Sequence, residues 1–494
     1  MKRSVIIILL ISLAVKGLVA QNVDDALRYS QTFYMGTARF MSMGGAFTAL
    51  GGDMSSFSQN PAGIGVMRSS ELSFSPQLLH NNTSSSFHGI NKDYLYNFNI
   101  GQAGIVSNLI SNSGTTGLLN LNVGYSFNKT NNLNSAVRIE GRSPSGSLTD
   151  YWANSSYGTR YTDLTGAAGI AYDAWLIDTI TGSGQNAYGT VFDFYGDNLS
   201  SDYGQNVRRY INNEGYTGEH AISIGGNYSN KIFFGATIGI NRIRYTGHYE
   251  HLEEADYYLD SGFKNFTYTE HFENTGTGVS FKIGTIIKPT EEIRIGFALH
   301  SPIYYKIDEY FYDNVSSNFT DNSHYEFNND PMRYNYALTT PFRALAGFAY
   351  QFKKSALFSI DYEFVDYSTA KFSETGDNYD YSLKNREIKS MLRPASNIRA
   401  GGEYRLDKFY FRGGYGYYGK AFETGELNDN MDHRTISFGI GFREQNINLD
   451  FGFTNLKSKQ NYIVFDPLVS NAATAGLTSN RNIFSFTMGY KFGY

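Results

Sequence analysis

The segment Phe484-Ser-Phe-Thr-Met-Gly-Tyr-Lys-Phe-Gly-Tyr494 decides the fold. Large apolar or aromatic residues alternate in it with small or polar ones. Successive side chains of a β-strand point to opposite faces, so the segment predicts a strand with one apolar and one polar face. The aromatic last residue is typical of the barrels found in outer membranes.

The same alternation recurs upstream, for example in Ile222–Tyr228, Ala356–Phe364, Phe409–Tyr417 and Ile436–Phe442. The apolar faces would meet in a shared core in a soluble sandwich, whereas they would face lipid in a membrane barrel. The connections favour the barrel, because tight turns alternate with long polar connections. The tight turns are expected at Ser229-Asn230, Pro289–Glu291, Lys353, Asp407 and Gln445.

Fourteen segments carry strand patterns: 71–80, 94–107, 117–129, 218–228, 231–245, 275–288, 292–304, 341–352, 354–372, 395–406, 408–420, 433–444, 446–463 and 481–494. A further candidate, 134–141, is assigned to the loop that follows the third strand, because single-chain bacterial barrels have even strand counts. The sequence therefore predicts an all-β protein. Residues 71–494 are expected to form a 14-stranded antiparallel transmembrane β-barrel with helical insertions in its extracellular loops.

The connection from residue 130 to residue 217 is too long to be structureless. Thr162 or Asp163 is expected to cap a helix within it. One face of that helix would carry Leu164, Ala167, Ala168, Ala171, Ala174 and Trp175. We expect this helix to pack over the mouth of the barrel.

The first twenty residues have the pattern of an export signal. Lys2 and Arg3 precede an apolar run, and Leu18-Val19-Ala20 offers a cleavage site before Gln21. Residues 1–20 are therefore expected to be a signal peptide. Together with the barrel pattern, this predicts a location in the outer membrane of a Gram-negative bacterium.

Composition excludes several other classes. The chain has no Cys, so it is not a disulfide-stapled scaffold. Its net charge of −5 and pI near 6.0 give no basic surface for nucleic acid. The mean hydropathy of −0.36, without a later long apolar run, excludes a helical membrane protein.

Residues 21–70 do not have a strand pattern, because glycines interrupt every periodic run: Gly36, Gly44, Gly45, Gly51, Gly52, Gly63 and Gly65. A compact glycine-rich segment before a barrel indicates a plug whose backbone packs closely against the inner wall. We therefore expect residues 21–70 to lie inside the barrel.

This segment resembles the FadL family of outer-membrane transporters for long-chain fatty acids and other hydrophobic compounds. The resemblance covers about residues 36–76. It lies in Gly36-Thr-Ala-Arg39, Gly44-Gly45-Ala46, Asp53 and Asn60-Pro61-Ala62. It assigns Arg39, Asp53, Asn60, Pro61 and Ala62 to the motif of the family's plug.

The resemblance implies a route for hydrophobic small molecules such as fatty acids or aromatic compounds. A ligand would be captured between extracellular loops, pass to an apolar pocket in the lumen, and leave sideways into the bilayer lipid after the plug shifts. Gly101, Gly104 or Gly124 would be candidate kink sites for the opening in the wall. The chain would act as a monomer without a cofactor.

Two predicted loops, 248–273 and 305–319, are rich in aromatic residues. Ligand-contact candidates in them are Tyr257, Tyr258, Phe263, Phe266, Tyr310 and Phe311. The alternative interpretation is that these side chains form an aromatic girdle or pack loop against loop.

Catalytic and metal sites are not indicated. His248, His251 and Glu253 are close in sequence, but a cluster in an exposed loop explains them better than a metal site. No phosphate-binding motif or G-x-S-x-G motif is present, so we expect no enzyme. A barrel esterase with Ser and His paired across strands remains an alternative.

Inward-facing charges, namely Arg399, Glu403, Arg405, Arg412 and Arg443, are expected to form a hydrogen-bonded network in the lumen. As an alternative, one of these arginines or Arg39 would receive a ligand carboxylate. Two other functions also remain open, a general porin for small polar solutes and a non-transporting barrel that binds a partner.

Overall fold

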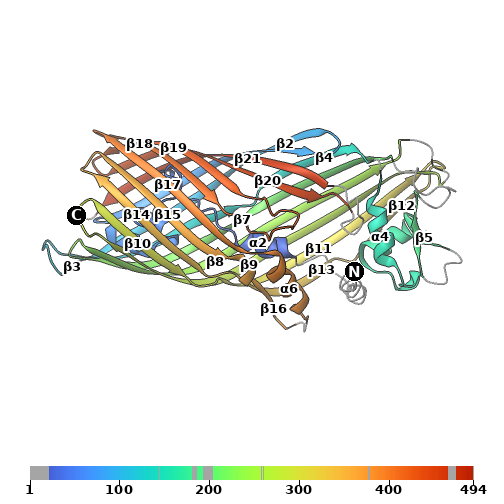
Figure 1. The fold of residues 1–494 in the computed structure, drawn as a ribbon, viewed down its shortest axis with the longest axis horizontal. Helices are drawn as coiled ribbons and strands as arrows, with labels where there is room; N and C mark the ends of the chain where they lie inside the picture. Colours follow the sequence, from blue (N-terminus) through green and yellow to red (C-terminus); the bar gives the residue numbers. More distant parts are fainter. Residues whose placement is uncertain are drawn as a thin grey trace.

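Fourteen antiparallel strands close into a barrel in the computed structural model of the chain (Figure 1). The structure describes residues 22–143, 145–180, 186–192, 204–256, 259, 261–376, 379–465 and 474–492, and the strand count refers to these residues. The ladder closes where β1 (Ser70–Ser86) pairs with β21 (Thr474–Phe492).

Ten positions of the wall are filled by single strands. They are β1, β2 (Ile90–Ser111), β7 (Asn206–Tyr228), β8 (Ile232–Glu254), β9 (Phe263–Ile287), β17 (Pro394–Leu406), β18 (Phe409–Tyr418), β19 (His433–Glu444), β20 (Ile447–Ile463) and β21. Four positions hold two strands in tandem. They are β3 (Leu118–Asn132) with β4 (Ser135–Arg142), β10 (Ile293–His300) with β11 (Tyr304–Phe319), β13 (Met332–Thr339) with β14 (Arg343–Phe352), and β15 (Ala356–Asp366) with β16 (Lys371–Glu374). Each predicted strand overlaps one of these fourteen positions.

The assignment of residues 134–141 to a loop is wrong, because these residues lie in β4. β3 pairs with the part of β7 from Tyr216 onward, and β4 pairs with Asn206–Asn213 of the same strand. β4 therefore prolongs β3 after a short break at Leu133 and Asn134. It adds no crossing of the membrane, so the even count is kept.

The segments expected as aromatic loops are largely strands. β8 continues to Glu254, β9 begins at Phe263, and β11 covers residues 304–319. The outward positions above the apolar part of β8 are Arg242 and Arg244, both exposed. The apolar alternation ends there because the strand faces water, although its ladder with β9 goes on.

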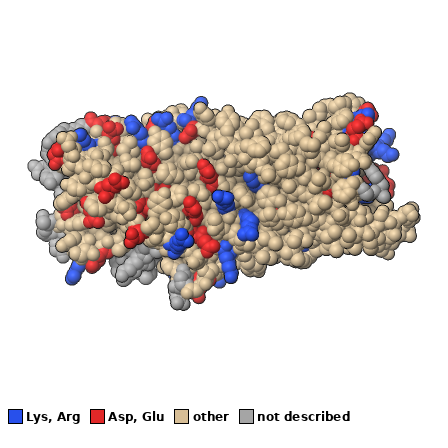
Figure 2. Space-filling view, turned by 180° about the vertical axis from the view of Figure 1, so that it is seen from behind, with Lys and Arg blue, Asp and Glu red and all other residues tan. Residues whose placement is uncertain are grey.

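The outer surface of the barrel carries exposed apolar side chains around its circumference. Examples are Ile222, Ile238, Phe281, Phe297, Phe348, Phe358, Ile436, Phe438, Phe484 and Phe486. Figure 2 shows a wide band nearly free of charged residues between the charged extracellular half and the opposite rim. Such a band is where a transmembrane barrel meets lipid.

The tight turns are confirmed at the rim of the barrel where the chain leaves β21. Ser229, Asn230, Lys353, Asp407 and Gln445 all have positive φ, as short hairpins require. No helix among the described residues is long and apolar enough to cross a membrane.

The other end of the barrel is capped by structured loops, as the predicted helical insertions imply. It contains α4 (Leu148–Ser156), η3 (Tyr161–Asp163), α5 (Gly166–Asp173), the hairpin of β5 (Ile177–Thr179) and β6 (Tyr188–Thr190), and β12 (His324–Asn328). The helix predicted after residue 163 is confirmed as α5, but Thr165 precedes it instead of Thr162 or Asp163. A further loop carries η4 (Tyr367–Thr369) and α6 (Ser382–Met391).

Residues 22–69, called the N-terminal segment below, lie within the barrel (Figure 1). The segment contains α2 (Val23–Ser30), α3 (Ala38–Ser42), η1 (Met54–Ser58) and η2 (Pro61–Val66). α2 packs in a buried apolar cluster with side chains of the extracellular half, including Tyr245, Ile307 and Tyr336.

Candidate functional site

Asn60 of the Asn-Pro-Ala motif joins the N-terminal segment to the wall. Its Oδ1 accepts from Ala62 N at 3.1 Å and so caps η2, which begins at Pro61. Its Nδ2 donates to Thr48 O at 2.6 Å and to Thr285 O of β9 at 3.2 Å. The motif therefore fixes a local turn and attaches that turn to a strand.

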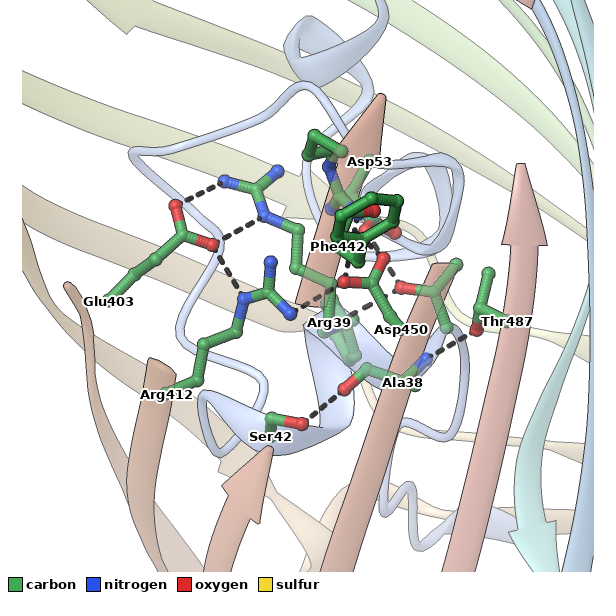
Figure 3. Close-up of polar contacts among 12 residues, drawn as sticks. Ala38, Arg39, Ser42, Asp53, Glu403, Arg412, Phe442, Asp450 and Thr487 are labelled. Atoms are coloured by element: carbon green, nitrogen blue, oxygen red, sulfur yellow. Dashed lines mark hydrogen bonds and ion pairs between the residues drawn. The ribbon is translucent and has the colours of Figure 1, made fainter. Parts of the chain in front are cut away.

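Arg39 lies in a buried network of charges at the base of α3 (Figure 3). Its guanidinium donates to Glu403 at 3.1 Å. Glu403 also accepts from Arg412 Nε at 2.6 Å, and Arg412 reaches Asp450 at 2.7 Å. Each charge has a partner of opposite sign, so the cost of burying it is offset.

Asp53 stabilises the fold of the N-terminal segment itself. Its carboxylate accepts from Thr37 Oγ1 at 2.7 Å and from Ser55 N at 2.9 Å. The second bond caps η1, and the first bond holds the start of α3 beside it.

Further wall residues hold the segment, and the sequence did not single them out. Asp361 accepts from Thr48 N and Oγ1 at 2.9 and 2.7 Å. Lys282 donates to Ser58 O at 2.8 Å, and His300 Nε2 donates to Gln59 O at 2.7 Å. The alternation within each strand predicts that these side chains point into the barrel. Their partners lie hundreds of residues away in the sequence, so the contacts themselves could not be predicted.

The β2–β3 ladder is interrupted partway along β2. Gln102 opposite Asn128 is its last pair, and residues 90–100 of β2 pair with β1 alone among the described residues. The β1–β2 register shifts at Pro76, which has no N–H, and Gly101 is left as the extra residue. Of the three candidate glycines, Gly101 is therefore the one at the irregularity.

Side chains, instead of backbone pairs, bridge the interruption. Lys129 Nζ donates to Asn99 Oδ1 at 2.7 Å just above the last pair. At the tip of the β1–β2 hairpin, Asn91 Nδ2 donates to Glu140 O at 2.8 Å. The wall between these contacts is held without a backbone ladder.

The extended part of the N-terminal segment, residues 31–36, covers this interruption from inside. Phe33 N and Met35 N donate to Thr130 O and Lys129 O of β3 at 2.8 and 3.0 Å. Gln77 of β1 donates to Gly36 O at 3.0 Å. These bonds supply partners to β3 carbonyls that β2 leaves unpaired, which a strand near lipid requires.

A small chamber lies beside residues 33–35. Its volume is about 30 Å³, which holds about one or two water molecules. Apolar side chains form much of its lining: Phe33, Met35, Met41, Leu79, Leu456 and Ile483. The polar members include Asn131, Asn132, Thr435, Thr454 and Arg481.

A larger cavity, the vestibule, lies between the N-terminal segment and the rim of tight turns. Its volume is about 440 Å³, and its lining includes Arg39, Arg68, Arg294 and Glu403. The N-terminal segment therefore separates a vestibule lined in part by charged side chains from a smaller, largely apolar chamber.

The predicted ligand contacts do not form one group. Phe263 and Phe266 are buried in the extracellular cap, where Phe266 lies 5.5 Å from the ring of Trp152. Tyr310 and Phe311 lie on β11, and Arg333 stacks over the Tyr310 ring. Tyr257 and Tyr258 lie outside the described residues.

The interpretation of His248, His251 and Glu253 as an exposed loop cluster is wrong, since all three lie on β8. His251 and Glu253 are fully buried and 2.8 Å apart. Glu253 also accepts from Leu148 N and Gln205 Nε2, at 2.8 and 2.9 Å. The pair therefore ties the cap to the barrel.

The expected charge network is confirmed in part. Arg399 donates to Glu363 at 2.7 Å, and Arg443 lies 2.9 Å from Asp450. Arg405 is not part of it, because it is exposed at the rim, where it donates to Asp407 O. The Arg405 side chain points inward as predicted, but the barrel interior opens into the vestibule at this height, so the side chain meets solvent.

Residues 208–492 match the model of a family described as outer membrane protein transport protein (OMPP1/FadL/TodX). Among solved structures, a FadL homologue of Pseudomonas aeruginosa has 13% identity, a TM-score of 0.54, and coverage of 93% of this chain and 99% of that chain. The toluene transporter TodX of Pseudomonas putida has 11% identity, a TM-score of 0.51, and coverage of 94% and 100%. At such identities the similarity shows the fold. The search of curated proteins finds no match.

Proposed function

Because the chain belongs to the OMPP1/FadL/TodX family of outer-membrane transport proteins, we propose that it takes up fatty-acid-like or aromatic small molecules and releases them sideways into the bilayer. Residues 1–20 would be removed as a signal peptide on export to the outer membrane of a Gram-negative bacterium. Residues 21–70 are the plug, residues 71–494 are the barrel, and the chain acts as a monomer without enzymatic activity.

The observation that carries this proposal is the interrupted β2–β3 ladder, closed from inside by residues 31–36. An apolar solute gains little from a watery channel, but it stays out of water if an apolar chamber opens onto lipid. The chamber and the interruption share the same lid, because Phe33 and Met35 contribute to both.

The proposed route begins at the extracellular end of the barrel, with Tyr257, Tyr258, Phe263, Phe266, Tyr310 and Phe311 as the proposed residues for ligand capture. Movement of residues 31–36 then enlarges the chamber and exposes the interruption. Two backbone bonds to β3 break in this movement, each of which contributes about 1 kcal/mol net. Such a cost is compatible with repeated opening.

The remainder of the N-terminal segment stays in place during this movement. Residues 37–67 are attached through the Arg39–Glu403 pair, the Thr48–Asp361 bonds and the Lys282–Ser58 bond. Breaking a buried ion pair by removing one partner costs about 3–5 kcal/mol. The plug is therefore proposed to have a fixed part and a mobile part.

Cross-linking tests this division, since the chain has no Cys of its own. Met35 and Leu79 pack in one cluster. A Met35→Cys, Leu79→Cys double variant linked by a short reducible bis-thiosulfonate is expected to lose uptake of a labelled hydrophobic solute. Uptake should return on reduction.

The matched control places the link in the fixed part. Ile64 and Ala221 share another cluster between the segment and the wall. Linking Ile64→Cys to Ala221→Cys should leave uptake at the level of the same variant before linking. Full uptake through the linked 35–79 variant would refute the proposed movement, and a steady conductance of the wild type in planar bilayers would favour a general porin.

A further inference from the structure

Three outward cations lie close together on β8 and β11. Arg242, Arg244 and Lys306 are all exposed. Arg242 is in register with Thr277 of β9, and Thr277 is in register with Lys306. Arg244 is in register with Thr275, one step further toward the extracellular end. Because residues in register share a face of an antiparallel sheet, the three cations form one group on the outside of the barrel, called the basic patch below.

The basic patch lies directly above the apolar band. The next outward residues toward the rim of tight turns are Ile240, Val279 and Tyr304, which are in register with one another. Val279 is 54% exposed and Tyr304 is 61% exposed. Below them lie the exposed side chains of Ile238 and Phe281. Figure 2 shows Lys and Arg side chains at the border between the charge-poor band and the charged half of the barrel. The basic patch therefore stands where the lipid head groups begin.

The cations of the basic patch have no ion-pair partner in the protein. None of the ion pairs among the described residues involves Arg242, Arg244 or Lys306. Asp308 of β11, in register with Thr275, is also outside these pairs. Three positive charges therefore face the head-group layer, where they can contact an anion from outside the protein.

The arrangement of the patch suits a group with several negatively charged oxygens. Arg242 Nη1 donates to Thr277 Oγ1, so its guanidinium extends over β9 toward Lys306. Two strand spacings, about 10 Å, separate the backbones of Arg242 and Lys306. Guanidinium and ammonium groups both donate to phosphate oxygens, and the threonine hydroxyls of β9 are further donors between them. A phosphate between β8 and β11 would therefore meet donors from three strands.

We propose that the basic patch binds the phosphate groups of lipopolysaccharide, the phosphorylated glycolipid of the outer leaflet. The acyl chains of the bound lipid lie along the outward side chains of the apolar band, directly below the patch. The patch thus continues the lipid-facing surface of the barrel into the head-group layer. This proposal goes beyond uptake, because it needs only the outer-membrane location that the family description gives.

The test compares lipid A that carries both of its phosphates with the same lipid A after the phosphates have been removed. Binding to the purified, delipidated full-length protein is measured by native mass spectrometry in ammonium acetate. The wild type should bind the phosphorylated form at least about tenfold more tightly, since several basic side chains attract the anionic head group together. The preference should shrink when the salt is raised from about 0.05 to about 0.5 M, because salt screens exposed charges.

Two double variants separate the patch from other outward cations. Arg242→Gln with Lys306→Gln should lose most of the preference while binding dephosphorylated lipid A as the wild type does. Both side chains are exposed, so the melting temperature should stay near that of the wild type. The matched control is Arg434→Gln with Lys457→Gln, which removes two cations in register on β19 and β20. Arg434 is already paired with Asp432, so this control should keep the preference.

The lipid site is overturned if the wild type binds both forms of lipid A equally, or if the patch variant and the control lose the preference to the same extent. Phosphatidylglycerol that competes as well as phosphorylated lipid A would also overturn it, because the patch would then take any anionic head group. Loss of the preference in the patch variant alone, with uptake of hydrophobic solutes unchanged, supports the site. The wild-type comparison decides the matter even if the patch variant does not fold.

Discussion

For single residues of the N-terminal segment, the sequence predicted contacts with neighbouring residues but not contacts with the wall of the barrel. The motif singled out Asn60, and its side chain does cap η2. Its Nδ2 also donates to Thr285 O, 225 residues along the chain, and no local pattern points to that partner. The contact exists only because closure of the barrel brings β9 against the segment.

A glycine on the wall marks the same contact, and it offers a prediction. A Cβ at Gly284 would lie 1.9 Å from Asn60 Oδ1. Gly284→Ala should therefore destabilise the protein by about 1–3 kcal/mol through overpacking. The variant should also show open-channel events in planar bilayers, because the added methyl group displaces the N-terminal segment from the wall of the barrel.

Gly413 provides the control for this substitution. It is also a strand glycine, but a Cβ there would meet nothing closer than 3.9 Å. Gly413→Ala should show the melting temperature and the quiet bilayer recording of the wild type. The same melting temperature and the same bilayer recordings for the two alanine variants would argue against close packing of Asn60 on Gly284.

At the scale of elements, prediction succeeded where one face of a strand meets lipid. Phe358, Ile360, Tyr362 and Phe364 of β15 alternate with buried Ser359, Asp361 and Glu363, and this strand was predicted. The extensions of β8, β9 and β11 were missed, since water on the outer side removes the need for apolar residues. The missed helix α4 did leave a signal, because Ser147 and Asp150 form a capping box at its start.

The interrupted ladder makes a prediction for hydrogen exchange. Amides of β2 from 91 to 100 that face β3, and amides of β4 that face β2, have no strand partner on that side. Peptides covering them should exchange at least about tenfold faster than peptides covering the β7–β8 ladder, which is continuous from Asn206 to Tyr228.

Mass spectrometry of the protein in micelles would measure these rates. Palmitate should slow exchange at the interruption only if the ligand occupies the adjoining chamber. Uniform protection across both regions without ligand would mean that a ladder forms there in solution.

At the scale of the whole molecule, the fold and the site were predictable to different degrees. The number of strands could be predicted from the alternation within each strand. The enclosed segment could be predicted from its own glycines. The site depends on which inward residues face each other, such as Asp361 with Thr48 and Arg481 with Asn132. Such pairs join residues far apart in the chain. The alternation within a strand predicts which side chains point inward, but it does not predict the residue that each one contacts.

Removing residues 22–69 should convert the closed barrel into a steady pore. The segment fills the bore between vestibule and chamber, so its loss leaves water in its place. The variant should also unfold more readily, because Asp361, Lys282 and His300 lose their bonds to the segment. Single-channel recordings and denaturant titration in micelles measure both effects.

An unchanged, closed recording from the shortened chain would mean that the extracellular cap alone blocks the bore. The cluster around Trp152 and Phe266 would then be the barrier to examine.

The seam between β1 and β21 has a consequence for biogenesis. β21 comes last of the barrel strands in chain order and completes the cylinder by pairing with β1, and Ala38 bonds to Thr487, 449 residues further on. No partly exported chain can therefore reach the sealed state. Until the final strand arrives, two sheet edges stay open to mispairing, so a chaperone or insertion machine must shield them throughout delivery.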